Sequence, residues 1–593
     1  MRRCSINEDL LRRRYSHRSD HDRFSIALDS LALLVPMNST VSEDNERNFC
    51  YGSIATTEED DDGGDDNNSI PSKKTSVETV RPQDASSMQR SQLIHQHQQQ
   101  QHHKHHTGSH HSVAEEGILL KDELLAMISL AVPVIATYLL ETIPGIITIV
   151  LVGRMRNDDE NDGENSKLHL DAAALAVMYY NIVGMATGLG LLTALDTLCA
   201  SAHGANQPTK MGQFLLTSAF VMGITMCLVW VILCYTSQTL VFLGLSQQLA
   251  SDAGIFVGYM LPGLPFIYAY EALRKLSQAR NETTPMVLAA VVSVLVNAGC
   301  GYYLVNFTSL GWLGAAVARS VGYMVMFPIV FLGMYYTDRE FISHVWEGFQ
   351  VKEAITKQAI SKFLNLGVPG MLQLVFEWGA FEILALLCGI LPNEEEAAIA
   401  VGANAVVTQL NSLLFMFYLG TSVSGNIRIG NALGSGDVHR AKLAFYLTLA
   451  LGTLLPLIGI LCIFSYRDVL PCFFTTDEEL IAKASDLFLI FALFQLPDSI
   501  NCVEQGAFKA FGKQSLASKL NFVAYYVIGI PLAYVLGLTL DLGVEGLWLG
   551  LTVGVFWGAI VNTIILSRSD WKQLSLDALK RLSIVHTREV NGE

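Results

Sequence analysis

Residues 285–305, "PMVLAAVVSVLVNAGCGYYLV", form an apolar run that contains no charged side chain. The run is close to the ~20 residues that an α-helix needs to cross the hydrocarbon core of a bilayer. Similar runs recur along the chain, among them "FLLTSAFVMGITMCLVWVILCY" (214–235) and "LGLTVGVFWGAIVNTIIL" (549–566). This recurrence predicts a polytopic helical membrane protein.

The composition agrees with this interpretation. Of 593 residues, 51% are apolar and only 16% are charged, whereas roughly 25% are charged in an ordinary soluble domain. The net charge of -16 comes mainly from acidic segments outside the apolar runs, such as "EEDDDGGDD" (58–66). We interpret these segments as solvated tails and loops and expect no nucleic-acid partner. The ten cysteines show no CxxC pair, so we expect neither a disulfide framework nor a metal site.

Three segments are expected to lie outside the membrane. Residues 1–117 are rich in Ser, Asp, Gln and His, which predicts a disordered cytoplasmic tail. Residues 337–361 have the mixed polarity of an amphipathic cytoplasmic linker, and residues 569–593 are expected to form a cytoplasmic C-terminal tail. Lysine and arginine are concentrated in the loops on the side of the tails, which places both termini in the cytoplasm by the positive-inside rule.

Between these segments we predict about twelve spans. We place the span centres near Ala136, Gly184, Met226, Leu264, Leu295, Met324, Gln373, Asn411, Leu454, Leu493, Val527 and Val555.

The spans fall into two similar halves. "AVPVIATYLLETIPG" from Ala131 aligns with "GVPGMLQLVFEWGAF" from Gly367, and "LGWLGAAVARSVGYM" from Leu310 aligns with "LGVEGLWLGLTVGVF" from Leu542. In the same way "LPGLPFIYAYEALRKL" (261–276) aligns with "LPDSINCVEQGAFKAF" (496–511). The fold class is therefore an all-α polytopic membrane protein with 12 transmembrane helices in two six-helix lobes, 118–336 and 362–568, related by pseudo-two-fold symmetry.

Acidic residues inside the predicted spans are the candidate functional residues, because a charge at the bilayer centre costs about 2.5–3.5 kcal/mol on insertion scales and marks a functional path. Glu377 lies deep in its span beside Trp378, and an aromatic ring next to a carboxylate suits a cationic ligand. Asp498 follows Pro497, where we expect a broken helix to free backbone groups. Glu382 fits either a functional or a packing role, as does Glu141, the repeat mate of Glu377.

A buried carboxyl group can exchange its proton near neutral pH, so one group can carry either a proton or a cationic substrate. No intramembrane basic residue is obviously placed to bind an anion. Glu271, Glu504 and Asp196 lie nearer the inner helix ends, where we expect structural pairing with bases such as Arg274, Lys275 and Lys509.

At these residues the sequence resembles the multidrug and toxic compound extrusion (MATE) family in its eukaryotic branch. The resemblance covers about 124–567 and is most specific in "GVPGMLQLVFEWGAFE" (367–382) and "GTSVSGNIRIGNALGSGDVHRAKLA" (420–444). It implies alternating access, with export of organic cations, drugs or secondary metabolites in exchange for protons. It also implies roles for Glu377, Glu382 and Asp498, and it places Thr148 where bacterial relatives carry an aspartate linked to cation coupling.

The resemblance therefore favours H+ over Na+ as the coupling ion, with no other cofactor, a small organic substrate and a monomer in the lipid bilayer. The plasma membrane and a vacuolar or endosomal membrane both stay open as locations. The main alternative is a lipid or lipid-linked-sugar flippase of the same wider superfamily, which would need bases facing the cavity. A membrane enzyme is not expected, since no catalytic constellation of His and Asp lies near an interface.

Overall fold

The computed structural model describes residues 113–153 and 163–583. In these residues it contains 12 helices that are long and apolar enough to cross a membrane, and each predicted span centre lies inside one of them. The N-terminal half has these elements: α4 (Val113–Gly153), α5 (Gly163–Tyr180), η1 (Asn181–Ala186), α6 (Thr187–Gly204), α7 (Pro208–Cys234), α8 (Thr236–Phe242), α9 (Gln247–Met260), η2 (Leu261–Gly263), α10 (Leu264–Ala279), α11 (Thr284–Phe307) and α12 (Leu313–Thr337).

The second half repeats this order after a linker that contains α13 (Arg339–Glu347) and α14 (Val351–Ala354). Its elements are α15 (Lys357–Gly389), α16 (Glu394–Gly434), α17 (Val438–Tyr466), η3 (Leu470–Phe473), α18 (Glu478–Phe511), α19 (Gln514–Phe522), η4 (Val523–Gly529), α20 (Ile530–Tyr534), η5 (Val535–Thr539) and α21 (Gly543–Ser567), followed by α22 (Trp571–Ser583). Elements η1, η4 and η5 are π-helical segments inside spans.

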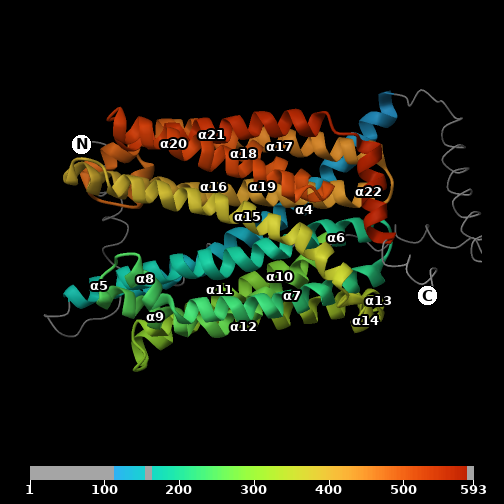
Figure 1. Cartoon of the computed structure of the whole chain (residues 1–593), viewed down its shortest axis with the longest axis horizontal. Helices are drawn as coiled ribbons and strands as arrows, with labels where there is room; N and C mark the ends of the chain where they lie inside the picture. Colours follow the sequence, from blue (N-terminus) through green and yellow to red (C-terminus); the bar gives the residue numbers. More distant parts are fainter. Residues whose placement is uncertain (1–112, 154–162, 584–593) are drawn as a thin grey trace, which may run out of the picture. The chain divides into compact units, whose positions relative to one another are not determined.

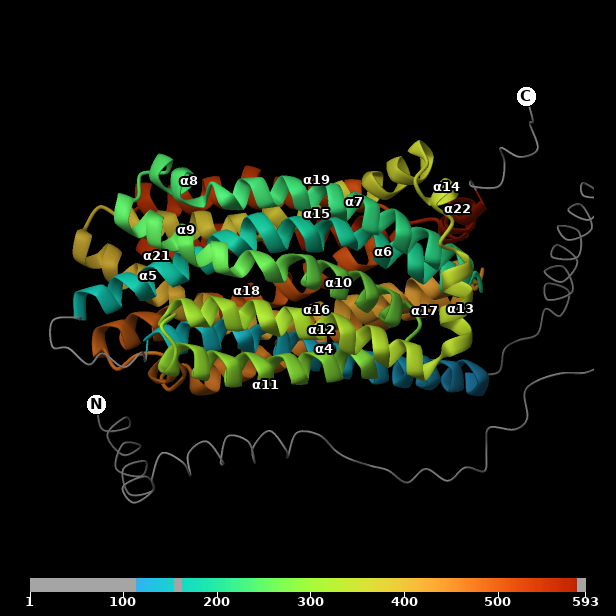
Figure 2. The same ribbon diagram turned by 90° about the horizontal axis from the view of Figure 1, so that it is seen from below.

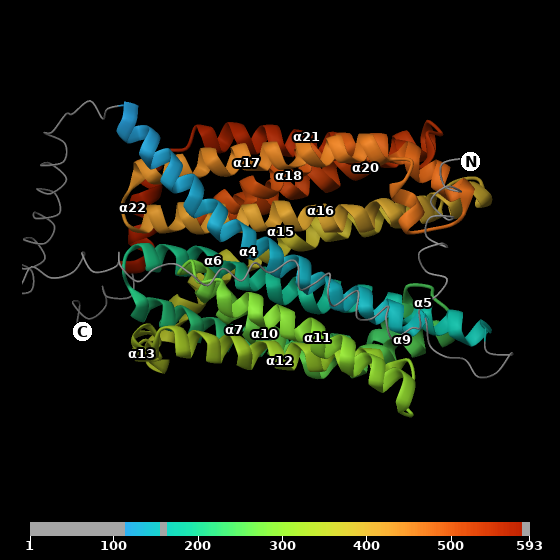
Figure 3. The same ribbon diagram turned by 180° about the vertical axis from the view of Figure 1, so that it is seen from behind.

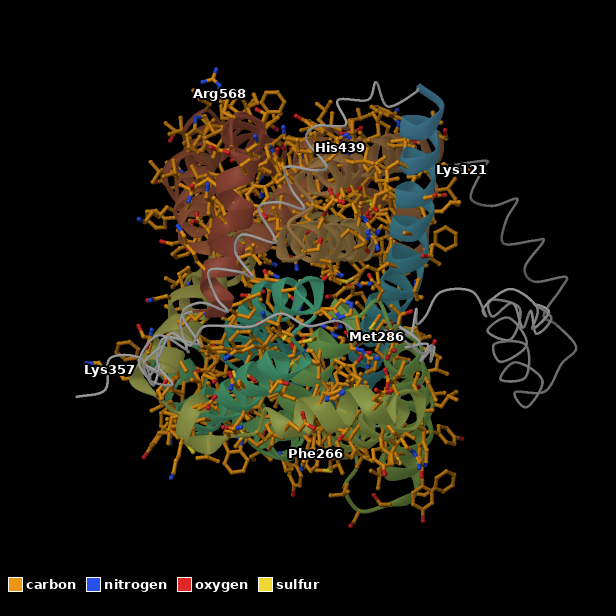
Figure 4. All side chains as sticks on the ribbon, turned by 90° about the vertical axis from the view of Figure 1, so that its right-hand side faces the viewer. Lys121, Phe266, Met286, Lys357, His439 and Arg568 are labelled. Atoms are coloured by element: carbon orange, nitrogen blue, oxygen red, sulfur yellow. The ribbon has the colours of Figure 1, made fainter. Side chains whose placement is uncertain are left out.

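The helices form two lobes, which we call the N-lobe (α4–α12) and the C-lobe (α15–α21). Figure 1 shows the green N-lobe helices and the orange and red C-lobe helices as two groups with nearly parallel axes. Each lobe has its own apolar core, built in the C-lobe around Trp548, Phe491 and Phe494. Figure 4 gives the end-on view, with Arg568 and His439 on one lobe and Phe266 and Met286 on the other.

Helix α4 connects the two lobes along its length. Near its start, Glu123 accepts hydrogen bonds from Arg428 and Arg440 of the C-lobe. Further along, Glu141 accepts one from Arg274 of the N-lobe at 2.7 Å. The helix therefore crosses from one lobe to the other, as its diagonal course in Figure 3 shows.

Helix α15, the repeat mate of α4, crosses in the opposite sense. Its first half packs on the N-lobe, where a Cβ atom added at Gly367 would lie 2.7 Å from the carbonyl oxygen of Leu191 in α6. Its second half packs on the C-lobe, where the ring of Phe376 lies 5.1 Å from that of Phe522. The absence of a side chain at Gly367 allows the close crossing.

The two lobes are joined at one end of the bundle, which we call the linker end because α13, α14 and α22 lie there (Figure 2). Thr197 of α6 donates a 2.6 Å hydrogen bond to the carbonyl oxygen of Lys509 in α18 and accepts one from Gln514. Asn431 of α16 donates to the carbonyl oxygen of Ala279 at 3.2 Å. The opposite end of the bundle is called the far end.

The C-terminal segment 569–593, predicted to be a tail, contains the helix α22. The ring of Trp571 packs edge-on against Phe511 at 5.1 Å, and Arg581 donates to the carbonyl oxygen of the same residue. Leu582 belongs to the apolar cluster that is built mainly from N-lobe residues and also includes Val423 and Ile427 of α16. Helix α22 thus touches both lobes, and burial lowers the pKa of Arg581 to about 10.

The first described helix extends into the segment that we predicted to be the N-terminal tail. Helix α4 begins at Val113, whereas the predicted tail runs to residue 117. The remainder of that tail, its histidine run included, lies outside the described residues.

Candidate functional site: a buried acid pair in the C-lobe

Glu377 lies on the buried face of α15. The buried residues Gln373, Glu377, Ala380 and Leu384 recur every three or four positions, which is the spacing of one helix face. Glu377 is only 8% exposed. The carboxylate of Glu377 therefore lies inside the lobe and does not face lipid.

Asp498 of α18 is the second acid of this site and is 2% exposed. It interacts electrostatically with Glu377. Its Oδ2 atom has no hydrogen-bond partner among the described residues. The expected helix break at Pro497 is wrong, because α18 continues through it from Glu478 to Phe511 and neighbouring helices hold the segment in place.

The aromatic groups beside the acids are tyrosines. Tyr525, fully buried in the π-helical segment η4, lies within electrostatic range of both Glu377 and Asp498, and the side chain of Asn501 lies beside its hydroxyl. Tyr418 of α16 interacts with Asp498 and donates a 2.8 Å hydrogen bond to Gln495. The site thus combines two carboxylates with two aromatic rings, a set that suits an organic cation.

Trp378 does not lie on the same face of α15 as Glu377. Consecutive residues of an α-helix point about 100° apart, and Trp378 is half-buried outside the stripe that holds Glu377. The role predicted for Trp378 stays a prediction, and Tyr525 is an aromatic residue within electrostatic range of the acid.

Glu382 also lies off the buried stripe and is half-buried. It forms no ion pair or side-chain hydrogen bond with the described residues, and its ring-bearing neighbour Phe381 packs against Phe494 and Trp548 in the core. The structure does not bring Glu382 together with Asp498.

Glu141, the repeat mate of Glu377, is held in an ion-pair network of the N-lobe. Arg274 donates to Glu141 at 2.7 Å and to Glu271 at 2.6 Å, and Tyr270 donates to Glu141 at 2.7 Å. The guanidinium also lies 4.6 Å from the ring centre of Tyr138. Glu141 therefore has a direct basic partner, unlike Glu377 and Asp498 of the C-lobe.

The remaining acids near the linker end, Asp196 and Glu504, also have side-chain partners. Asp196 forms a buried ion pair with Lys275 at 2.9 Å. Glu504 accepts a hydrogen bond from Thr563 rather than from Lys509. Lys509 interacts electrostatically with Asp196 and with Glu377.

Thr148 uses its hydroxyl within its own helix. It is 1% exposed and donates a 2.8 Å hydrogen bond to the carbonyl oxygen of Pro144. Within residues 113–153 and 163–583, no group of three His, Cys, Asp or Glu side chains could hold a metal ion.

One intramembrane base was missed by the sequence interpretation. Arg319 lies inside the candidate span Leu313–Thr337 and is 7% exposed, although we expected no base in such a position. The signal was present in "LGWLGAAVARSVGYM", where a single arginine interrupts an apolar run.

Comparison with known proteins agrees with the two-lobe architecture. The family model MatE matches twice, at residues 133–303 and at residues 369–535. The two matches begin at Pro133 and Pro369, which the internal alignment pairs.

Curated relatives cover most of the chain. The Danio rerio protein "Multidrug and toxin extrusion protein 1" is 29% identical over 78% of this chain and 75% of its own length. The Arabidopsis thaliana "Protein DETOXIFICATION 17" is 28% identical over 78% of this chain and 94% of its own length.

Solved structures show the same fold. The eukaryotic MATE transporter AtDTX14 matches with a TM-score of 0.71 and 25% identity, covering 78% of this chain and 100% of that one. A mutant of the Vibrio cholerae MATE transporter VcmN matches with a TM-score of 0.66 and 16% identity over 78% of this chain and 99% of that one. The chain belongs to the MATE family of multidrug and toxin extrusion transporters and is an integral membrane protein, with 12 spans in its described residues.

Proposed function

We propose that this transporter exports organic cations in exchange for protons by alternating access, and that Glu377 and Asp498 hold the proton and the cation in turn. The observation that carries the proposal is the contrast between the lobes: Glu141 is paired with Arg274, whereas Glu377 and Asp498 interact with each other and form no ion pair within the described chain. Two buried carboxylates that interact in this way disfavour simultaneous ionisation. A proton or a cation relieves this repulsion, which makes the two ligands compete.

The proposed coupling ion is H+ rather than Na+. The hydroxyl of Thr148 is bound to the carbonyl oxygen of Pro144, and the N-lobe acid Glu141 is bound to Arg274. This leaves the C-lobe as the place where an ion would meet uncompensated negative charge. The substrate class is small organic cations, in keeping with the tyrosine rings of Tyr418 and Tyr525 beside the acids.

We further propose that the linker end faces the cytoplasm, with both termini on that side, in the plasma membrane or in a vacuolar or endosomal membrane. The bases of the loops and of α13, α14 and α22 gather there. Because the lobes are hydrogen-bonded together at the linker end, through Thr197 and Lys509 among others, we assign the structure to a state that is closed on the cytoplasmic side.

The test is efflux of rhodamine 123, a fluorescent organic cation, from proteoliposomes under an imposed proton gradient. Glu377→Gln and Asp498→Asn should each abolish gradient-driven efflux while the protein still inserts. The matched control is Glu347→Gln, an acid of the linker whose side chain is 62% exposed, which should transport as the native protein does. Efflux that ignores the gradient, or that survives both substitutions, contradicts the proposal and directs attention to lipid substrates.

A further inference from the structure

Arg319 is a buried cation without a carboxylate partner among the described residues. Its Nε donates to the hydroxyl of Tyr323 at 3.1 Å and its Nη2 to the side-chain oxygen of Asn181 at 3.4 Å, and both acceptors are neutral. Its Nη1 has no hydrogen-bond partner in the same part of the chain. A guanidinium in a buried site is costly unless a negative charge compensates it.

A second unpartnered donor lies beside this guanidinium. The hydroxyl of Tyr180 is fully buried and has no partner within the described chain. The electrostatic neighbours of Tyr180 are Arg319, Tyr323 and Tyr268. Two donors, one of them charged, thus lie here without an acidic acceptor from residues 113–153 or 163–583.

The backbone at this point is irregular. Asn181 begins the π-helical segment η1, and Tyr268 donates a 2.6 Å hydrogen bond to the carbonyl oxygen of Gly184 within it. Short π-helical segments inside α-helices are frequent at functional sites. The C-lobe offers a parallel, since Tyr525 beside the acid pair also lies in a π-helical segment.

Arg319 lies in the half of α12 that is nearer the far end. It lies about 9 Å along α12 from Leu313, at 1.5 Å per residue, and α12 begins at the far end, since its other end leads to α13. The charge belongs to one lobe only, because the repeat places Leu551, a fully buried apolar residue, at the equivalent position of the C-lobe.

We propose that Arg319, with Tyr180 and Asn181, forms a binding site for a monovalent anion, either a carboxylate group of the substrate or a free halide. A guanidinium matches a planar carboxylate with paired N–H donors, which favours the substrate carboxylate. In that case the substrates include zwitterions, whose cationic group binds to the C-lobe acids. The zwitterion part of this inference rests on the proposed function, whereas anion binding itself does not.

The binding test uses the purified full-length protein in detergent. Its thermal unfolding temperature is measured while chloride or acetate is added, for the native protein, for Arg319→Gln and for Arg319→Lys. The native protein should show a saturable rise with the anion that Arg319→Gln lacks and that Arg319→Lys shows more weakly. The matched control is Arg339→Gln, because Arg339 lies at the start of α13 beside Tyr335 and outside the proposed site; it should respond as the native protein does.

The same titration distinguishes an anion-binding role of Arg319 from a purely structural role. If Arg319 only holds Asn181 and Tyr323 in place, Arg319→Gln lowers the unfolding temperature at every anion concentration and leaves the anion response unchanged, which overturns the proposal. If it binds an anion, the substitution removes an uncompensated charge, and the variant is at least as stable as the native protein when the anion is absent.

The transport test compares two dyes that differ at one group. Rhodamine 110 carries a free carboxyl group, and rhodamine 123 is its methyl ester. Arg319→Gln should lower the ratio of rhodamine 110 to rhodamine 123 transport by about tenfold, as expected for loss of a charge-assisted hydrogen bond. Stabilisation by acetate together with a lowered ratio assigns the site to a substrate carboxylate, whereas stabilisation by chloride with an unchanged ratio assigns it to a halide.

The outcomes also separate this inference from the proposed function. Native protein that shows no anion response, or the same response in Arg319→Gln, overturns the anion site even if proton-driven transport of rhodamine 123 is intact. Loss of proton coupling, with the anion response preserved, contradicts the antiport proposal and leaves the anion site standing.

Discussion

Arg274 donates a 2.7 Å hydrogen bond to Glu141 and joins α10 to α4 in the N-lobe. The repeat places Lys509 and Glu377 at the equivalent positions of the C-lobe. These two residues interact electrostatically but form no direct ion pair with each other. The two equivalent positions thus form a direct ion pair in the N-lobe and none in the C-lobe. We therefore expect substitution of the two equivalent acids, Glu141 and Glu377, to have different effects.

Glu141→Gln should destabilise the protein, since it removes the carboxylate that accepts from Arg274 and Tyr270. The expected loss in unfolding free energy is about 1–3 kcal/mol, because Arg274 keeps Glu271 as a partner. Glu377→Gln should cost little or raise stability, because it removes a buried charge without such a partner. Thermal unfolding in detergent measures the stability of both variants. Equal losses of stability in Glu141→Gln and Glu377→Gln would show that Glu377 also has a partner that stabilises its charge.

The tyrosine of η4, rather than the tryptophan of α15, should govern cation affinity. Tyr525→Ala removes a ring that interacts with both acids and should raise the KM for an organic cation by about fivefold or more, given about 1 kcal/mol or more for a desolvated cation–π contact. Trp378→Ala removes a ring on another face of the helix and should change KM by less than about twofold, a free-energy difference of about 0.4 kcal/mol. Concentration-dependent uptake into proteoliposomes measures the two constants, and the reverse order would restore Trp378 to the site.

The apolar runs and the repeat were enough to predict the 12 spans, because membrane insertion depends on local hydrophobicity. The predicted acids Glu377 and Asp498 are both buried in the C-lobe and lie within electrostatic range of each other, while their role stays a prediction. The pairing of Glu141 with Arg274 could not be predicted, because it depends on how two helices far apart in the chain rotate against each other.

Two further features escaped the sequence interpretation for similar reasons. Trp378 follows Glu377 directly, but neighbours in a helix point about 100° apart, so sequence adjacency is a poor guide to contact. Helix α22 has the polar composition of a tail, and its buried apolar residues, Trp571, Leu574, Ala578 and Leu582, reveal that it packs against the body.

Glycines at the linker end allow the lobes to approach closely. A Cβ atom added at Gly434 of α16 would overlap the carbonyl oxygen of Ser201 in α6. Gly434→Ala should therefore keep the lobes apart at this end and speed amide exchange in residues 197–207, which hydrogen–deuterium exchange measures. Gly223→Ala is the control, because nothing lies within 4 Å of a Cβ atom there. Equal amide exchange rates in Gly434→Ala and Gly223→Ala would contradict close packing of α16 against α6 at the linker end.

Helix α22 should stabilise the closed linker end because it contacts both lobes. Leu582, 3% exposed within the N-lobe core, and Leu576, 52% exposed, lie on the same helix. Leu582→Glu gives up about 1.5–3 kcal/mol of apolar burial and places a charge in the core, so α22 should detach and amide exchange at the linker end should rise. Leu576→Glu should leave unfolding within about 0.5 kcal/mol of the native value. Thermal unfolding and hydrogen–deuterium exchange of the two variants measure the difference, and a helix that only rests on the surface would give the same result for both.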